Sequence, residues 1–307
     1  MDVFFTLFSN IAPLYALIVL GWLAGRFYGV DRESIAGLAI YIIVPIVSFY
    51  YVAEIDFKPA FALLPVIVFT IYSVLTIMVY QLGKFVYPDK RANLLAMCSA
   101  ASNTGYFGLP LVILLFAPEW VGVYVFALVG ALFYEATVMY YIANRGNFSP
   151  KESIMNVLRF PVLYAVFLGL LVNFLQLDLP SQLDPYWTYF KGAYVVVGMM
   201  IVGCSLPKLS DLLIGPKFLT IVFVSQFVIW PLIAFAFISF DKAILQWYEP
   251  EIYKMLMIIA IVPPAANITA YAAKLDLNPE KAATTVLLGT IFALFYIPAV
   301  LIISGLY

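Results

Sequence analysis

The side chains that could carry chemistry in this chain are two amides that lie beside breaks in apolar segments. The segment LLAMCSAASNTGYFGLPLVILLF places small and polar residues around Asn103, in the middle of an apolar run. A second run, KMLMIIAIVPPAANITAYAAK, has adjacent prolines followed by Asn267. Proline donates no backbone hydrogen bond and disfavours a helical residue before it. Both runs are therefore predicted to be interrupted helices. The residues expected at the interruptions are Gly105, Pro110, Pro263 and Pro264.

These interruptions predict a binding site for an anion. Where a helix is interrupted, its second half begins with unpaired N–H groups and the positive end of the helix dipole. Two such ends that meet inside a membrane can hold a carboxylate, and the amides of Asn103 and Asn267 add donors. The alternative is that the prolines only kink the helices and the asparagines only join neighbouring helices.

The positions of the basic residues limit the number of carboxylates expected on the substrate. No Lys or Arg lies deep in any apolar run, so the first carboxylate would be held without a cation. No basic residue is expected to be available for a second carboxylate. This favours a monocarboxylate with an apolar or aromatic body.

Glu135 is the acidic residue that lies deepest in an apolar run. Eight residues, ATVMYYIA, separate it from Asn144. An ionised carboxylate at membrane depth is costly, so it is expected to be protonated, paired or hydrated. Glu135 is therefore a candidate for a proton or cation site coupled to transport. The alternative is a structural carboxylic acid, or a side chain that extends toward the cytoplasmic interface. The chain has no histidine, which excludes imidazole metal sites, Ser-His-Asp triads and histidine proton relays. We expect no catalytic residue, metal or cofactor.

The composition is that of a membrane protein. Of the 307 residues, 65% are hydrophobic and 11% are charged, against about 45–50% and about 25% in soluble domains. A net charge of −1 gives no reason to expect nucleic acid as a partner. We predict an all-α polytopic membrane protein with ten spans of about 20 residues. The expected spans are 4–25, 35–53, 61–83, 93–116, 120–143, 157–176, 190–206, 218–240, 254–273 and 282–305.

The basic residues are unevenly distributed between the two faces that ten spans create. The loops after spans 1, 3, 5, 7 and 9 hold 12 of the 16 Lys and Arg residues, and the opposite face holds 4. Basic loops stay in the cytoplasm. This predicts that both termini lie outside a plasma membrane or bacterial inner membrane.

Ten spans divide into two halves of five, 1–145 and 153–307. An odd number of spans per half makes the halves insert in opposite orientations, as in inverted-repeat transporters. Weak internal similarity supports this division. APLYALIVLGWL in span 1 is similar to FPVLYAVFLGLL in span 6, and the spacing of Lys90 and Asn103 matches that of Lys254 and Asn267. The alternative is that apolar helices resemble one another by composition alone.

The same segments carry a family resemblance over essentially the whole chain. SNTGYFGLPLV at 102–112, IIVPIVSFYYVAE at 42–54, IVGCSLPKL, and VPPAANITAYAAKLDLNPEKAATTVLLGT resemble, in order, segments of the auxin efflux carrier family. That family includes plant PIN-formed proteins and bacterial organic-acid carriers. The chain differs from the plant members in its short loop after span 5 and in having Ser102 where they have proline.

The resemblance implies a fold similar to those of bile-acid sodium symporters and sodium/proton antiporters. Broken spans 4 and 9 would cross, spans 1, 2, 6 and 7 would form a scaffold domain, and spans 3–5 and 8–10 would form a transport domain. It also implies a homodimer that pairs through the scaffold. The residues expected to bind substrate are Val44, Ser48, Asn103, Thr104, Tyr106, Pro264 and Asn267.

Together these observations predict a carrier of small organic anions that works by elevator-type alternating access. The substrate would be an auxin-like acid, such as indole-3-acetic acid, or another carboxylic acid. The alternative is a sodium- or proton-coupled symporter for malonate, malate or bile-acid-like substrates. An intramembrane enzyme is disfavoured because the chain lacks histidine and a mid-span aspartate. A passive channel would differ from a carrier by conducting single-channel currents.

Overall fold

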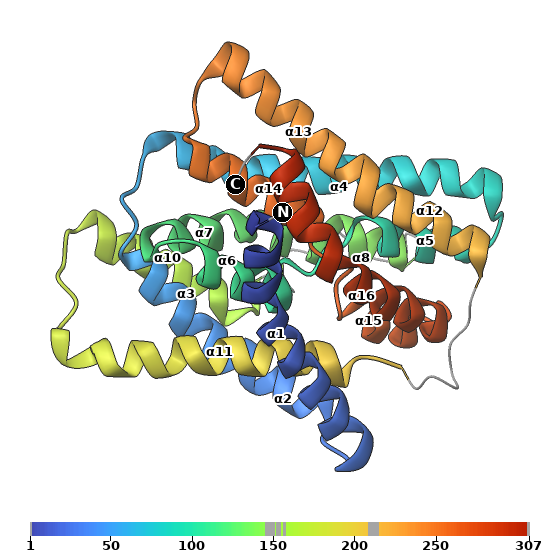
Figure 1. Ribbon diagram of the computed structural model, residues 1–307, viewed down its shortest axis with the longest axis horizontal. Coiled ribbons are helices and arrows are strands. Elements are labelled where there is room, and N and C mark those ends of the chain that lie inside the picture. The colour runs from blue at the N-terminus through green and yellow to red at the C-terminus, as the bar shows by residue number, and fades with distance from the viewer. Residues whose placement is uncertain (1, 145–150, 152–154, 156–157, 208–214, 306–307) are drawn as a thin grey trace.

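The computed structural model describes all residues except 1, 145–150, 152–154, 156–157, 208–214 and 306–307. In the described part, the regular secondary structure is helical apart from one isolated antiparallel bridge between Ser102 and Pro264. The apolar runs form the helices, and the charged or turn-rich segments connect them (Figure 1). The predicted boundary between the two halves falls at residues outside the described part.

The helices fall into long and short segments. Three of the described α-helices have 23 residues or more: α1 (Asp2–Phe27), α4 (Leu64–Val86) and α16 (Pro279–Ile303). The others in the first half are α2 (Arg32–Leu38), η1 (Ala39–Ile43), α3 (Val44–Ala53), η2 (Pro59–Leu63), α5 (Arg91–Ala100), η3 (Thr104–Gly108), α6 (Leu109–Leu115), α7 (Pro118–Tyr134), η4 (Glu135–Met139) and α8 (Tyr140–Ala143). Those in the second half are α10 (Pro161–Phe174), η5 (Ser181–Leu183), α11 (Asp184–Cys204), α12 (Pro216–Val224), η7 (Ser225–Ile229), α13 (Trp230–Phe240), η8 (Asp241–Leu245), α14 (Pro250–Ile261) and α15 (Ile268–Lys274).

Seven continuous helical stretches in the described part are long and apolar enough to cross a membrane. They are Phe4–Phe27, Arg32–Ala53, Pro59–Val86, Pro118–Ala143, Ser181–Cys204, Pro216–Leu245 and Pro279–Ile303. The chain is thus a multi-pass membrane protein. The other predicted spans contain shorter helices: α5 and α6 at 93–116, α10 at 157–176, and α14 and α15 at 254–273.

Several spans contain a π-helical turn immediately before a proline. η1, η3 and η7 each end two residues before Pro45, Pro110 and Pro231, respectively. A proline ring clashes with the carbonyl four residues earlier, and a wider turn moves that carbonyl away. The helices therefore continue through these prolines, and proline alone does not determine where a span is broken.

One set of helix contacts joins α1 to α11, and α3 to α10 and α11. In Figure 1, α3, α10 and α11 lie on the left, and α1 descends through the centre across α11. Another set joins α4 to α5 and α7, α13 to α14, and α15 to α16, and α3–α7 and α1–α16 contacts connect the two sets. Glycines allow the close approach of α1 and α11: a Cβ on Gly203 would meet the Ile18 carbonyl, and one on Gly21 would meet Met200.

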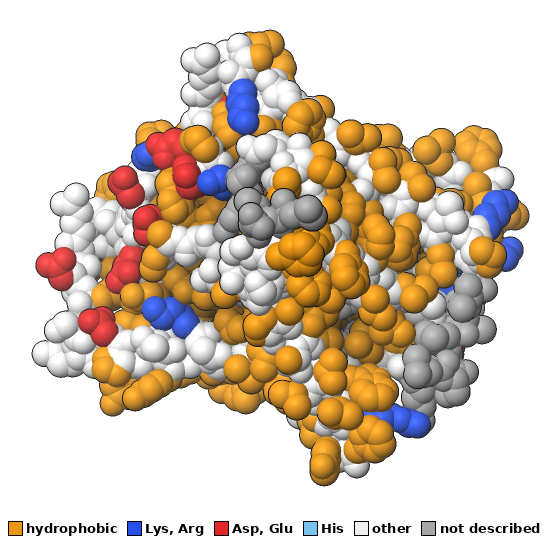
Figure 2. All heavy atoms as spheres, in the orientation of Figure 1, with side chains coloured by type: hydrophobic (Ala, Val, Ile, Leu, Met, Phe, Trp, Pro, Cys, Tyr) orange, Lys and Arg blue, Asp and Glu red, His pale blue; other side chains and the backbone are white. Residues whose placement is uncertain are grey.

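The outer surface suits a lipid environment. Figure 2 shows hydrophobic side chains over most of the visible face, with acidic side chains gathered toward its left edge. Large apolar side chains, including Phe85, Phe174 and Ile303, are more than four-fifths exposed. In water such a surface would drive association, whereas in a bilayer it contacts lipid.

Candidate functional site

The two interrupted helices meet through their non-helical backbone. The Asn103 N–H donates to the Pro263 carbonyl at 2.7 Å, and the Ala265 N–H donates to the Ala101 carbonyl at 2.8 Å. These bonds form an antiparallel bridge between the non-helical segment that follows α5 and the one that precedes α15. Backbone groups freed from a helix at membrane depth must be satisfied within the protein. The two breaks therefore satisfy part of each other's backbone.

The structure places the first interruption earlier than the sequence suggests. The non-helical residues are 101–103, whereas Gly105 and Pro110 lie in the continuous helix formed by η3 and α6. The π-turn of η3 explains why Pro110 does not break that helix. In the second interruption, Pro263 and Pro264 lie in the non-helical segment between α14 and α15, as expected for adjacent prolines.

A third span supports both breaks. Ser102 Oγ accepts hydrogen bonds from Gln226 Nε2 at 2.7 Å and from Trp230 Nε1 at 3.2 Å. The same Gln226 amide donates to the Val262 carbonyl at 3.0 Å. All three side chains are buried. Ser102 thus links the two helix breaks to η7 and α13.

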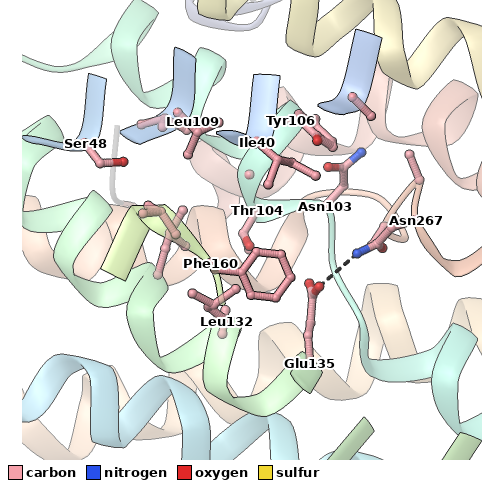
Figure 3. A pocket seen from close by; sticks show the side chains of 18 of the residues that line it. Ile40, Ser48, Asn103, Thr104, Tyr106, Leu109, Leu132, Glu135, Phe160 and Asn267 are labelled. Carbon is pink, nitrogen blue, oxygen red and sulfur yellow. Dashed lines mark hydrogen bonds between the residues drawn. The ribbon is translucent and has the colours of Figure 1, made fainter. Parts of the chain in front are cut away.

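A cavity of about 480 Å³ lies against this crossing, a volume within the usual range for small-molecule sites. Figure 3 shows Asn103, Thr104 and Tyr106 facing the cavity beside Asn267, with Ser48 across from them and Glu135 below. The sequence-predicted residues that line it are Val44, Ser48, Asn103, Thr104, Gly105, Tyr106, Glu135 and Asn267.

Pro264 does not line this cavity. It is buried in the bridge with Ser102, and its ring packs against Gly289 of α16, where a Cβ would collide with it. Its place in the structure is to hold the crossing together. The family resemblance predicted Pro264 as a substrate-binding residue, but a resemblance in sequence does not distinguish a residue that lines the cavity from one that lies directly behind its wall.

Asn103 offers an unused hydrogen-bond donor. The residue is 3% exposed, and its Nδ2 has no partner among the described residues. Its backbone is held on both sides, since its N–H donates to Pro263 and its carbonyl accepts from the Gly108 N–H at 2.9 Å. A buried donor without a partner is costly, and here the donor belongs to a residue that lines the cavity. The Tyr106 hydroxyl and Asn267 Oδ1 also lack partners in the described chain.

Glu135 and Asn267 form a pair across the cavity. Asn267 Nδ2 donates to Glu135 Oε2 at 2.8 Å (Figure 3). Glu135 begins η4, whereas Asn267 directly precedes α15. The carboxyl group that the sequence isolates therefore has a polar partner at the second interruption. The two residues are 132 positions apart, so only the fold brings them together.

Arg32 is a site residue that the sequence analysis did not identify. It begins α2, and Asp31 caps that helix by accepting the Ser34 N–H at 2.9 Å. Hydrogen bonds from the Ser34 hydroxyl and N–H hold the pKa of Asp31 below its usual value. The Arg32 side chain lines the cavity, and its Nη2 donates to the Ala266 carbonyl at 3.3 Å. The expectation that no basic residue is available is thus wrong for this site.

The rest of the wall is mainly apolar. Ile40, Leu132 and Phe160 face the cavity from three different spans (Figure 3). Tyr194 and Tyr124 support the polar side by donating their hydroxyls to the carbonyls of Gly105 at 2.7 Å and Thr104 at 3.0 Å. The arrangement can hold an anionic group at one wall and an apolar body against the others.

Comparisons with known proteins agree with this architecture. Residues 6–153 match the family model described as "Membrane transport protein", and residues 191–306 match that of the "Sodium Bile acid symporter family". A protein of Methanocaldococcus jannaschii named as an uncharacterized transporter is 25% identical over 295 residues, which cover 92% of this chain and 93% of the relative. These matches point to a membrane transporter rather than an enzyme, and they agree with the resemblance to the auxin efflux carrier family.

Proposed function

We propose that the chain is a secondary carrier that moves small organic anions by elevator-type alternating access. The observation that carries this proposal is the buried, unpartnered Nδ2 of Asn103, a residue that lines the cavity beside the two helix breaks. A substrate carboxylate would accept this donor, and the N-terminal end of the helix formed by η3 and α6 would add a favourable dipole. The apolar walls would hold the carbon skeleton.

The proposed transport cycle follows from the division of the ten expected spans. Spans 1, 2, 6 and 7 would remain as the scaffold, and spans 3–5 and 8–10 would carry the crossing. Support comes from the reciprocal packing of α1 on α11 and of α3 on α10, because two inverted repeats would place their first two spans in this way. Both termini would lie outside a bacterial inner membrane or plasma membrane, and the scaffolds of two copies would pair.

Cation coupling is the second candidate. It is favoured by the match of residues 191–306 to the sodium bile acid symporter model and by the Glu135–Asn267 pair at the crossing. In this form, a change in the protonation or cation contact of Glu135 would alter its bond to Asn267. A proton- or sodium-dependent flux of the same acid would distinguish a symporter from an exporter or exchanger.

The test is binding of defined acids to the purified full-length chain. Indole-3-acetate, malonate and malate would be titrated against the wild type and Asn103→Ala, with pH and sodium varied. A hydrogen bond to a charged group contributes about 1.5–3 kcal/mol, so the substitution should weaken the bound acid about 10- to 100-fold. Asn93→Ala is the control, because Asn93 lies on α5 and donates to the Ile142 carbonyl away from the cavity. Unchanged affinity in Asn103→Ala would place the site elsewhere.

A further inference from the structure

A basic side chain, Arg32, lines the cavity, although the contact between the two interrupted helices does not require a positive charge there. Arg32 lines the same cavity as Asn103, yet it belongs to α2 rather than to either interrupted helix. Its side chain is partly buried, although it begins a helix next to a loop. Burying a guanidinium group has a desolvation cost that an anionic partner offsets.

The hydrogen bonds of Arg32 leave most of its donors free. A guanidinium group has five N–H donors, and the described structure gives this one a single acceptor, the Ala266 carbonyl at 3.3 Å. Its Nε is buried without a partner among the described residues. One neutral carbonyl does not neutralise the charge, whereas a carboxylate can accept two parallel bonds from the guanidinium fork.

The nearby acidic side chains do not supply that partner. In the part of the chain that is described, the ion pairs are Lys58–Glu249, Lys90–Asp276, Arg91–Asp89 and Lys254–Glu251. Glu33 lines the same cavity, but its side chain is exposed and forms no ion pair with Arg32, and Glu135 is bonded to Asn267. The positive charge of Arg32 therefore faces the cavity without an ion-pair partner from the described residues.

We propose that Arg32 binds a second anionic group of the substrate, so that the site takes a small dicarboxylate. This inference rests on the proposed function and narrows its substrate class. One carboxylate would accept from Asn103 at the crossing, and the other would accept from Arg32 at the α2 end of the cavity. Ala266 and Asn267 are consecutive, so Arg32 and Glu135 contact neighbouring positions of one segment. That segment directly precedes α15 and would lie between the two carboxylate positions.

The proposal is tested with pairs of acids that differ only in their second charge. Malonate, succinate and glutarate would each be compared with the corresponding monomethyl ester by binding to the full-length chain in lipid nanodiscs. Arg32→Gln should weaken the best-bound dicarboxylate about 10- to 100-fold, the usual range for a charged hydrogen bond. Its monomethyl ester should change less than about threefold, which is the smaller effect expected for an uncharged group. Arg32→Lys should recover part of the affinity, because it restores the charge but not the paired donors.

Two controls separate the possible outcomes. Arg26→Gln removes an exposed charge on α1 outside the cavity and should leave both affinities unchanged. A thermal unfolding profile for each variant reports whether the fold is retained. Equal weakening of diacid and ester by Arg32→Gln would overturn the second subsite while leaving the organic-anion function in place. Absence of binding of every acid to the wild type would overturn both.

Discussion

Ser102 offers a direct test of how the crossing is held together. Its Oγ is the acceptor for both Gln226 Nε2 at 2.7 Å and Trp230 Nε1 at 3.2 Å. Replacing Ser102 with alanine leaves the indole N–H of Trp230 without its hydrogen bond to Ser102, while Gln226 keeps its bond to the Val262 carbonyl. Trp230 is 2% exposed, so water does not readily replace the lost acceptor.

The expected magnitude follows from these contacts. A buried neutral donor left without a partner costs roughly 1–3 kcal/mol. We therefore expect Ser102→Ala to lower the free energy of unfolding by roughly that amount. Ser99→Ala is the matched control, because Ser99 lies one turn earlier on α5 and is fully buried. Its hydroxyl has no partner in the described part of the chain, so its removal should be neutral or slightly stabilising.

The assay is reversible unfolding in mixed lipid–detergent micelles, titrated with a denaturing detergent and followed by tryptophan fluorescence. A further variant, Ser102→Ala with Gln226→Leu, removes two hydrogen-bonding side chains and should cost less than the sum of the two single changes. Binding of the probe acids would be measured in parallel, since Ser102 also lines the cavity. If Ser102→Ala and Ser99→Ala have equal effects, the hydrogen bonds to Ser102 do not stabilise the crossing.

Two other predictions concern coupling and helix packing. Glu135→Gln should flatten the pH dependence of acid transport, because it removes the titratable partner of Asn267. The control is Glu119→Gln, an exposed change on α7, which should keep the wild-type pH profile. Both variants would be measured by transport into proteoliposomes at several pH values, and a wild-type profile for Glu135→Gln would exclude Glu135 as the coupling group. Gly203→Leu should destabilise the α1–α11 contact by about 1–3 kcal/mol or more, because its Cβ would meet the Ile18 carbonyl. Gly192→Leu on the same helix is the control, because the space around a Cβ at that position is open. Equal free energies of unfolding for the two variants would contradict the packing argument.

Of the two helix breaks, the sequence predicts the position of one correctly and not that of the other. Adjacent prolines predict the second break at Pro263 and Pro264, because local backbone chemistry is enough to end a helix there. The first break lies at 101–103 rather than at Gly105 or Pro110. Its position depends on pairing with residues 263–265, and no local pattern records a partner so distant in the chain.

The cavity residues show the same division. Asn103, Asn267 and Glu135 could be selected from the sequence because burying a polar group in a membrane span costs free energy. Such residues are therefore rare and indicate a functional site. Arg32 could not be selected in this way, since a basic residue beside a loop is expected to face water. Its direction depends on the capped start of α2 and on the Ala266 carbonyl.

The sequence by itself determined the membrane class, the apolar helical runs and the polar residues at which chemistry is possible. These properties follow from composition, hydrophobic length and proline geometry, all of which act over neighbouring residues. Only the tertiary structure decided that Asn267 contacts Glu135, that Pro264 lies behind the wall, and that Arg32 enters the cavity. Each of these depends on contacts between separate helices, and such contacts exist only after the helices have packed.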